Sequence, residues 1–282
     1  MSELARQDMA EAQEAPPRPL IYRQSVWTRL THWLWAVALF FLLLSGLNIF
    51  NAHPTLYVGR ESGFAYDNAV LKIDADFNQT PPAGFVEVLG RRFDTTGLLG
   101  ISERDGEREV RAFPYWATIP SFYDLATARV VHFFFAWMLS ATLLVWLAAS
   151  LLNGHARRDV VPGRRDLRRL PRDVADHLRL RFRHTREYNP LQKLSYAGVL
   201  FVALPLMILT GLSMSPSFNA VAPLLLDLFG GRQTARTIHF VTMLALVLFF
   251  VVHVVMVVAA GPFNELRSII TGWYRADRET RP

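Results

Sequence analysis

Four of the eight histidines in this chain of 282 residues fall in long apolar stretches, where an ionisable side chain is costly. They are His32, His132, His239 and His253. An imidazole nitrogen is a common ligand for iron, copper or zinc, so histidines in such stretches indicate a metal or haem site. For any one of them alone, a hydrogen bond between two helices is an equally good explanation.

The spacing of the last two histidines places two ligands on one helix face. His239 and His253 are 14 residues apart, which in an α-helix is a rise of about 21 Å with the two directions within roughly 40° of each other. One helix would therefore carry a nitrogen ligand near each of its ends.

The amino-acid composition excludes several kinds of metal and cofactor site. Cysteine is absent, which excludes disulfides, thiolate-ligated iron–sulfur clusters, Cys-type zinc sites and covalently attached c-type haem. The apolar stretches also lack carboxylates, so a zinc ion would not find its usual three or four ligands there. Pairs of histidines instead suit non-covalent b-type haem with both axial positions filled, for which electron transfer is the natural task.

Each of these histidines lies within or, for His32, directly before one of four uncharged runs: residues 33–50, 130–153, 194–216 and 237–262. Each run, with its flanks, is long enough to cross a hydrocarbon core of about 30 Å. Only 19% of the residues are charged, against about 25% in a typical soluble domain. We therefore predict an all-α membrane protein with a four-helix transmembrane bundle, a lipid bilayer as its surroundings and no nucleic-acid partner.

Arginine indicates the topology. Residues 154–192 contain eleven arginines and five acidic residues, whereas residues 52–128 contain seven basic and eleven acidic ones. The positive-inside rule places the first segment in the cytoplasm and the second outside. Both termini are then cytoplasmic, and the first apolar run is expected to remain as an uncleaved anchor.

The predicted organisation alternates helices with connecting segments. It comprises a cytoplasmic tail (1–26), helix 1 (27–51), a periplasmic loop or cap (52–128), helix 2 (129–153), an Arg-rich cytoplasmic loop (154–192), helix 3 (193–216), a periplasmic loop (217–235), helix 4 (236–261) and a cytoplasmic tail (262–282). The long outer loop is rich in aromatic residues and has a turn signal at Asp105-Gly106 and an alternating stretch at residues 85–88. It is expected to be a small folded domain.

With this topology the four histidines form two pairs by depth. Helix 1 runs outward, and His32 lies near its inner start. Helices 2 and 4 run inward, so His132 and His239, near their starts, lie at the outer level, and His253, near the end of helix 4, lies at the inner level. We predict that the first pair ligates an outer haem b and the second pair an inner haem b.

Arg29, Arg129 and Arg236 each stand three residues before one of these histidines. Residues at this spacing share a helix face, so the three arginines are candidates for binding haem propionates. Ordinary snorkelling of interfacial arginines is the alternative. Similarly, Gly46, Gly198 and Gly211 either allow a flat macrocycle to approach or serve helix packing.

In these features the chain resembles the di-haem cytochrome b subunits of bacterial nickel–iron hydrogenases, formate dehydrogenase-N and thiosulfate reductase, within the cytochrome b561-like superfamily. The likeness covers one histidine on each of the first two helices, two on the fourth and none on the third. It extends to Tyr188-Asn189-Pro190-Leu191-Gln192-Lys193, which is similar to a Tyr-Asn-x-x-Gln-Lys element of the family. The resemblance implies quinone contacts at Asn189, Gln192 and Lys193, and a helix N-cap is a compatible second role for Asn189.

The resemblance also implies a function. Such a subunit lies in the bacterial cytoplasmic (inner) membrane and relays electrons between a periplasmic partner and the quinone pool, with menaquinone or ubiquinone as the exchangeable redox partner. The long outer loop most resembles thiosulfate-reductase-type subunits, which implies the catalytic subunit of a molybdopterin-type oxidoreductase, or a c-type cytochrome, as the partner. The chain itself is expected to lack a substrate-converting site.

Three other functions fit parts of the sequence. A self-sufficient quinol-dependent oxidoreductase would act on a small oxidant at the outer haem and would be active without a partner. A transporter would carry ionisable groups at mid-membrane, and the four runs contain no carboxylate. A haem-free anchor, in which the histidines pair with each other, would be colourless.

Overall fold

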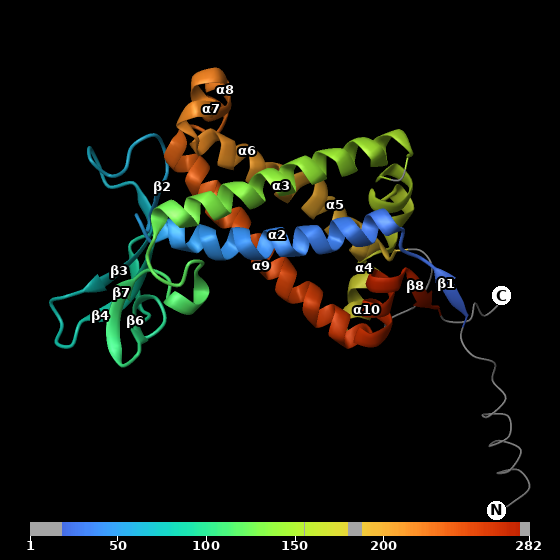
Figure 1. Ribbon diagram of the computed structural model, residues 1–282, viewed down its shortest axis with the longest axis horizontal. Coiled ribbons are helices and arrows are strands. Elements are labelled where there is room, and N and C mark those ends of the chain that lie inside the picture. Colours follow the sequence, from blue (N-terminus) through green and yellow to red (C-terminus); the bar gives the residue numbers. More distant parts are fainter. Residues whose placement is uncertain (1–18, 155, 180–187, 277–282) are drawn as a thin grey trace, which may run out of the picture.

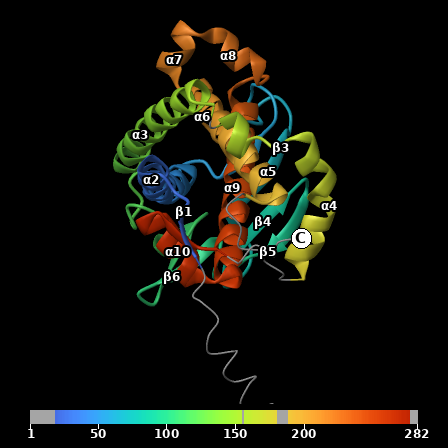
Figure 2. The same cartoon turned by 90° about the vertical axis from the view of Figure 1, so that its right-hand side faces the viewer.

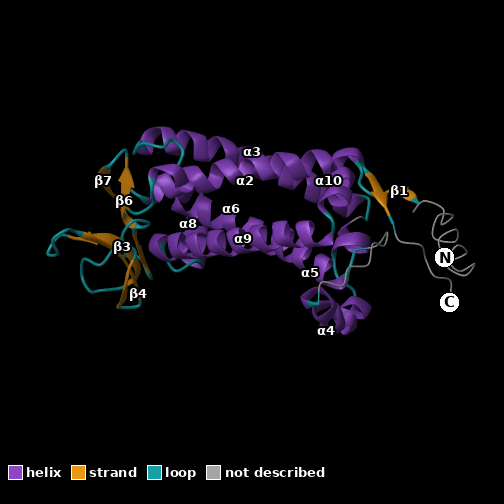
Figure 3. Ribbon diagram, turned by 90° about the horizontal axis from the view of Figure 1, so that it is seen from below, coloured by secondary structure: helices purple, strands orange, loops and turns teal. Residues whose placement is uncertain are grey.

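The computed structural model describes residues 19–154, 156–179 and 188–276. The beginning of the predicted cytoplasmic tail, part of the Arg-rich loop and the end of the C-terminal tail lie outside these described residues. Within them, a bundle of long helices carries a β domain at one end and short helices at the other (Figures 1 and 3).

Four helices are long and apolar enough to cross a membrane. They are α2 (Val26–Phe50), α3 (Leu125–Leu152), the segment Pro190–Met214 and α9 (Arg232–Ala260). They run side by side along the long axis of the molecule (Figure 3). Large apolar side chains on α3, such as Trp137 and Leu144, remain about two-thirds exposed at 67% and 65%, as expected for helices that face lipid. The prediction of four transmembrane helices agrees with this arrangement.

The third of these helices changes its winding near the middle. It consists of α5 (Pro190–Gly198), a π-helical turn η3 (Val199–Ala203) and α6 (Leu204–Met214). Pro205 lies two residues after the end of this turn and has no backbone N–H to donate. The wider turn accommodates the proline, so the helix continues across the span.

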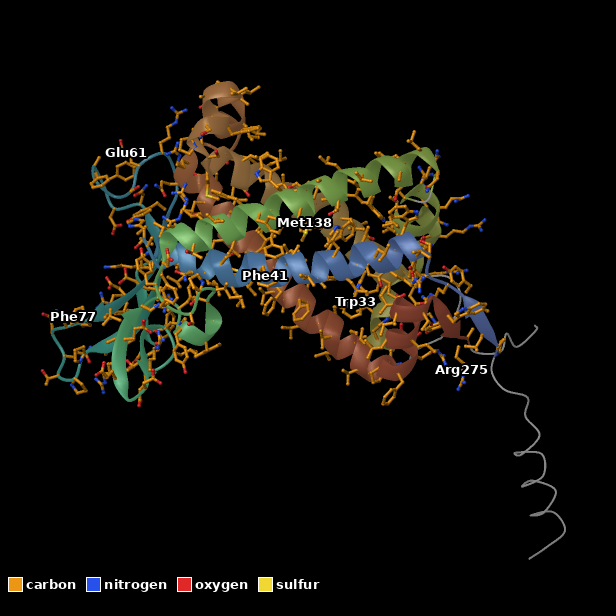
Figure 4. All side chains as sticks on the ribbon, viewed as in Figure 1. Trp33, Phe41, Glu61, Phe77, Met138 and Arg275 are labelled. Atoms are coloured by element: carbon orange, nitrogen blue, oxygen red, sulfur yellow. The ribbon has the colours of Figure 1, made fainter. Side chains whose placement is uncertain are left out.

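The bundle is built from two helix pairs, since α2 packs on α3 and α6 packs on α9. An apolar cluster of Ala38, Leu139, Leu143 and Leu204 lies between them. Figure 4 shows Phe41 and Met138 in the middle of the bundle, far from Phe77 in the β domain. The Phe41 ring stacks on that of Phe135 with centroids 4.3 Å apart, which joins α2 to α3.

The segment between α2 and α3 folds as a β domain, here called the cap. A four-stranded antiparallel sheet has the order β2 (Thr55–Tyr57), β3 (Ala69–Asp76), β4 (Ala83–Val88) and β5 (Arg91–Asp94), and a hairpin joins β6 (Gly100–Arg104) to β7 (Glu107–Arg111). Asp105 and Gly106 form the hairpin turn with positive φ angles of 53° and 83°, as two-residue hairpin loops require. The all-α prediction is therefore wrong for this segment, because strands this short leave only brief alternating stretches in the sequence.

The cap is fixed to the bundle beside the start of α9. Thr234 on α9 accepts a hydrogen bond of 2.7 Å from the Gly59 backbone N–H, and Gln233 donates one of 2.6 Å to Ser62. A buried apolar cluster also joins the two parts and consists of Phe50, Leu56, Ile73, Ala112 and Phe240. Gly231 precedes α9 with a φ of +117°, and a Cβ there would lie 2.8 Å from the Gly59 carbonyl oxygen. The close approach of cap and bundle therefore requires glycine at this position.

Short elements cover the opposite end of the bundle. They are α4 (Arg164–Leu178), α10 (Pro262–Thr271) and the antiparallel strands β1 (Leu20–Tyr22) and β8 (Trp273–Arg275). The remaining short helices are η1 (Tyr115–Ala117), η2 (Ala156–Val160), α7 (Pro216–Val221) and α8 (Pro223–Leu228). Because β1 pairs with β8, the two ends of the described chain meet on this side, away from the cap (Figures 1 and 2).

Candidate functional site: two facing histidine pairs

The four histidines lie in two facing pairs, one near each end of the bundle. His132 of α3 faces His239 of α9 near the cap, with ring centroids 6.5 Å apart and planes inclined by 56°. His32 of α2 faces His253 of α9 near the other end, with values of 6.4 Å and 50°. We call these the cap-side pair and the tail-side pair. The structure thus brings together the residues that the depth argument paired, while their role as haem ligands stays a prediction.

The separation of the rings fits one metal ion between each pair. With metal–nitrogen bonds of about 2 Å and about 1.2 Å from each nitrogen to its ring centroid, two imidazoles on opposite sides of one metal ion would have centroids about 6.4 Å apart. A direct N–H···N hydrogen bond of about 3 Å would bring the centroids to about 5.4 Å. The observed 6.4 and 6.5 Å match the first arrangement. This geometry argues against histidines that merely pair with each other.

Each pair supplies only two protein ligands. Among the described residues, no group of three or more His, Cys, Asp or Glu side chains could hold a metal ion. A bare zinc or copper ion would be left with too few ligands. A porphyrin supplies the other ligands of its iron, so two histidines from the protein are enough and the donor set fits haem.

A buried hydroxyl group contacts each ring of the cap-side pair. Ser45 Oγ of α2 lies 3.1 Å from Nδ1 of His132, and Thr210 Oγ1 of α6 lies 2.9 Å from Nδ1 of His239. Both hydroxyl residues are fully buried, with 0% of their surface exposed. The sequence analysis did not single them out, although each directly precedes a glycine that it did single out, Gly46 or Gly211.

These two glycines face histidine rings. A Cβ at Gly46 would lie 3.3 Å from Cε1 of His132, and one at Gly211 would lie 3.5 Å from Cε1 of His239. At Gly198, in contrast, a Cβ would have no neighbour within 4 Å. Gly46 and Gly211 therefore allow the imidazoles to lie close to the adjacent helix.

Apolar and aromatic groups surround the tail-side pair. Nδ1 of His32 is buried and has no hydrogen-bond partner in the part of the chain that the structure describes. The His32 ring meets the edge of Trp33 at 5.3 Å, and the His253 ring stacks on Phe249 at 5.8 Å. The two pairs thus share their spacing and differ in their surroundings.

The three candidate propionate arginines lie at the ends of their helices. Arg29 donates a hydrogen bond of 2.7 Å to the Ile270 carbonyl, and Arg236 donates one to the His53 carbonyl. The Arg129 guanidinium lies 5.7 Å from the centre of the Phe133 ring. Their contacts to haem propionates stay a prediction.

The predicted quinone element begins α5 at the tail end of the bundle. Asn189 occupies the N-cap position, and its backbone N–H donates to Gln192 Oε1 over 3.2 Å. Lys193 forms an ion pair of 3.2 Å with Asp166 of α4. This element therefore joins α5 to α4, and its contact with quinone stays a prediction.

A polar cluster that sequence reasoning missed lies close by. The Arg23 guanidinium sits 5.1 Å from the Tyr188 ring centre and 4.4 Å from that of Tyr274, whose hydroxyl donates to Glu265 Oε1 over 3.1 Å. Burial, reinforced by the Glu265 carboxylate, raises the pKa of Tyr274. Only Tyr188 had a signal in the sequence, since the others come from segments far apart in the chain.

Comparison with known proteins gives two matches. Residues 162–272, which include α5 to α10 and both histidines of α9, match the family described as prokaryotic cytochrome b561. A relative from Azospira oryzae is 26% identical over 233 residues, which cover 82% of this chain and 87% of the relative. That relative is named as a candidate protein-methionine-sulfoxide reductase subunit, YedZ1.

Proposed function

This chain belongs to the cytochrome b561-like superfamily of haem-binding membrane electron-transfer proteins, and on that premise we propose that it is a di-haem subunit. It relays electrons between a redox partner at the cap and quinone at the tail end. His132 and His239 ligate one haem b, and His32 and His253 ligate the other. The haems supply reversible one-electron exchange, while the helices hold the ligands.

The observation that carries this proposal is the pair of facing imidazoles at each level. The two separations of 6.5 and 6.4 Å arise from different helices, α3 and α2, opposite a single helix, α9. Fourteen residues of α9 separate the two levels, which is about 21 Å. Electrons would thus cross the bundle between two sites held at fixed spacing.

Charge supports an orientation with the cap outside. Helix α4 carries Arg164, Arg165, Arg168, Arg169 and Arg172 and lies at the tail end (Figure 3). Such a cluster favours the cytoplasmic side, where it meets anionic lipid headgroups. The cap then faces the periplasm, and both chain ends are cytoplasmic.

Quinone binding is proposed at the tail end, where α5 begins. Asn189 and Gln192 provide amide groups there, and Lys193 provides a cation. These groups are suited to bind the carbonyl and hydroxyl groups of a quinone–quinol couple. Tyr188, which exchanges hydrogen bonds of 3.1 and 3.2 Å with Gln24, closes this region toward β1.

The partner is proposed to be the catalytic subunit of a periplasmic oxidoreductase. The Azospira oryzae relative is named as a subunit of a reductase, which supports an assembly of this kind. The molybdopterin type of that partner rests on the resemblance of the long outer loop alone.

Reduction by quinol in single-histidine variants tests the relay. His132→Ala should retain one haem that a quinol still reduces at the wild-type rate, because the tail-side pair is intact. His32→Ala should also retain one haem, which dithionite reduces promptly and quinol at least tenfold more slowly. The matched control is His53→Ala, which changes a histidine outside both pairs and should keep two haems and the normal rate.

Two results would contradict the proposal. Either variant could retain both haems, which would overturn the ligand assignment. The His32→Ala protein could be reduced by quinol as fast as wild type, which would overturn the order of the sites. Conversion of a small oxidant by the isolated chain would favour the self-sufficient oxidoreductase.

A further inference from the structure

The cap-side pair contains the same arrangement twice. Ser45 of α2 contacts His132 of the next long helix, α3, and Thr210 of α6 contacts His239 of the next long helix, α9. In both cases the hydroxyl residue is fully buried and a glycine follows it. Two unrelated helix pairs therefore present a hydroxyl oxygen to the same ring atom, Nδ1.

The direction of these hydrogen bonds follows from the neighbouring carbonyls. Ser45 Oγ lies 2.6 Å from the Phe41 carbonyl oxygen, and Thr210 Oγ1 lies 2.6 Å from that of Leu206. Two oxygen atoms approach this closely only when a hydrogen lies between them, and each hydroxyl has a single hydrogen to donate. Each hydroxyl therefore donates to its own helix and accepts from the histidine.

The accepted hydrogen bond selects one tautomer of each ring. With Nδ1 carrying the proton, Nε2 carries the free lone pair. A neutral imidazole can ligate a metal only through the nitrogen without a proton. The hydroxyls thus leave Nε2 as the ligand atom and also restrict rotation of each ring.

We propose that Ser45 and Thr210 are positioning residues of the cap-side haem, which fix the tautomer and orientation of its two ligands and lower its reduction potential. This inference rests on the proposed function. A hydrogen bond from Nδ1 to an acceptor makes the imidazole a stronger electron donor and so favours the oxidised metal. His32 of the tail-side pair lacks such a bond, because its Nδ1 has no partner among the described residues.

The chain offers matched controls for each hydroxyl. Ser140 donates to the Ala136 carbonyl over 2.7 Å, and Thr242 donates to the Ile238 carbonyl over 2.7 Å. Both make the same intrahelical bond as Ser45 and Thr210, and neither forms a hydrogen bond with a histidine within the described structure. Ser140→Ala therefore matches Ser45→Ala, and Thr242→Val matches Thr210→Val.

The experiment is a redox titration of the full-length holoprotein, combined with low-temperature EPR of the oxidised haems. Ser45→Ala and Thr210→Val should each shift the midpoint potential of one haem upward and leave the other unchanged. The double variant should shift the same haem further. The EPR signal of that haem should also change, since its g values depend on the orientation of the axial rings.

Conservative variants distinguish a positioning role of the hydroxyl groups from a general effect on folding. Ser45→Thr and Thr210→Ser keep the hydroxyl and should keep the wild-type potentials. Loss of the cap-side haem in Ser45→Ala also supports the inference, provided that Ser45→Thr and Ser140→Ala retain it. Unchanged potentials and EPR signals in both Ser45→Ala and Thr210→Val would overturn it, as would equal shifts in the two controls.

Failure of the inference and failure of the proposed function give different results. If the wild-type protein holds two haems and His132→Ala loses one, unchanged potentials in the hydroxyl variants reject only the positioning role. If the wild-type protein holds no haem, the proposed function itself fails.

Discussion

The cap end and the tail end of the bundle hold histidine pairs with nearly the same spacing in different surroundings. At the cap end, buried hydroxyl groups lie within hydrogen-bond distance of both rings, and the apolar cluster around Phe50 and Phe240 covers the helix ends. At the tail end, His32 lacks such a partner among the described residues, and the polar groups of Arg23 and Glu265 lie nearby.

This difference separates two requirements of an electron relay. The spacing within a pair depends on where α9 and its neighbours place the two rings, and it is nearly the same at both levels. The electronic properties of a ligand depend on the group at its second nitrogen, and the two ends differ in that group. The cap end thus places a hydroxyl group beside each proposed ligand, whereas the tail end carries the polar groups proposed to bind quinone.

The largest effect is expected where the cap meets the bundle. Gly231→Ala places a side chain at a φ of +117° and brings its Cβ to 2.8 Å from the Gly59 carbonyl oxygen, so it should destabilise the fold by about 2–3 kcal/mol. Thermal unfolding of the detergent-purified protein, followed with haem loss from the cap-side pair, measures this. Gly97→Ala is the control, because Gly97 also has a positive φ of 90° and a Cβ there meets nothing within 4 Å.

A smaller, functional effect is expected at the tail end. Gln192→Ala should slow reduction by quinol about tenfold without changing haem content, because loss of one hydrogen bond to the quinone costs about 1.4 kcal/mol. Stopped-flow absorbance with a soluble quinol analogue gives the rate. Gln233→Ala removes a glutamine at the cap end, where it bonds to Ser62, and should leave the rate unchanged. Equal rates in the two variants would contradict a contact between Gln192 and quinone and would leave Gln192 only its hydrogen bond at the start of α5.

The two cap-side glycines should respond differently to alanine. At Gly46 the new Cβ would lie 3.3 Å from the His132 ring, which is tight, whereas at Gly211 it would lie 3.5 Å from the His239 ring, an ordinary contact. Gly46→Ala should therefore lower the occupancy of the cap-side haem or shift its potential, and Gly211→Ala should leave both near wild type. Haem content per chain and redox titration test this, and the reverse order would contradict the geometry.

The smallest effect concerns pH at the cap end. Burial, with a contribution from the Arg236 charge, lowers the pKa of His53 below its usual value. Since the unfolded chain then binds a proton more readily, stability should fall slightly as the pH drops below about 6.5. The change should be less than about 1 kcal/mol because the ring is largely exposed. His53→Gln should flatten this part of the curve of unfolding temperature against pH. An unaltered slope would mean that other groups cause the pH dependence of stability.

The sequence predicts those features that repeat along one helix or depend on composition. Four charge-free runs predict the four long helices, and the spacing of His239 and His253 predicts that α9 carries a histidine at each level. The Asp105-Gly106 turn and the alternation at residues 85–88 indicate parts of β6, β7 and β4.

Features that depend on contact between distant segments escaped prediction. Ser45 and Thr210 are isolated hydroxyls in apolar helices, and their contacts with His132 and His239 bridge 87 and 29 residues. The attachment of the cap to α9 likewise depends on the hydrogen bond between Gly59 and Thr234, which lie 175 residues apart. Contacts between distant segments leave no periodic signal in the sequence. Only the glycines next to the two hydroxyl residues, Gly46 and Gly211, indicated the surroundings of the cap-side pair.

The central claim is that each facing histidine pair holds one haem. A count of haem and iron per chain in the detergent-purified wild-type protein, together with a dithionite-reduced minus oxidised spectrum, tests it most directly. The structure predicts two b-type haems per chain, both low-spin with two axial imidazoles. A folded protein without haem, or one that keeps its full haem content when His132 is replaced by alanine, would contradict it.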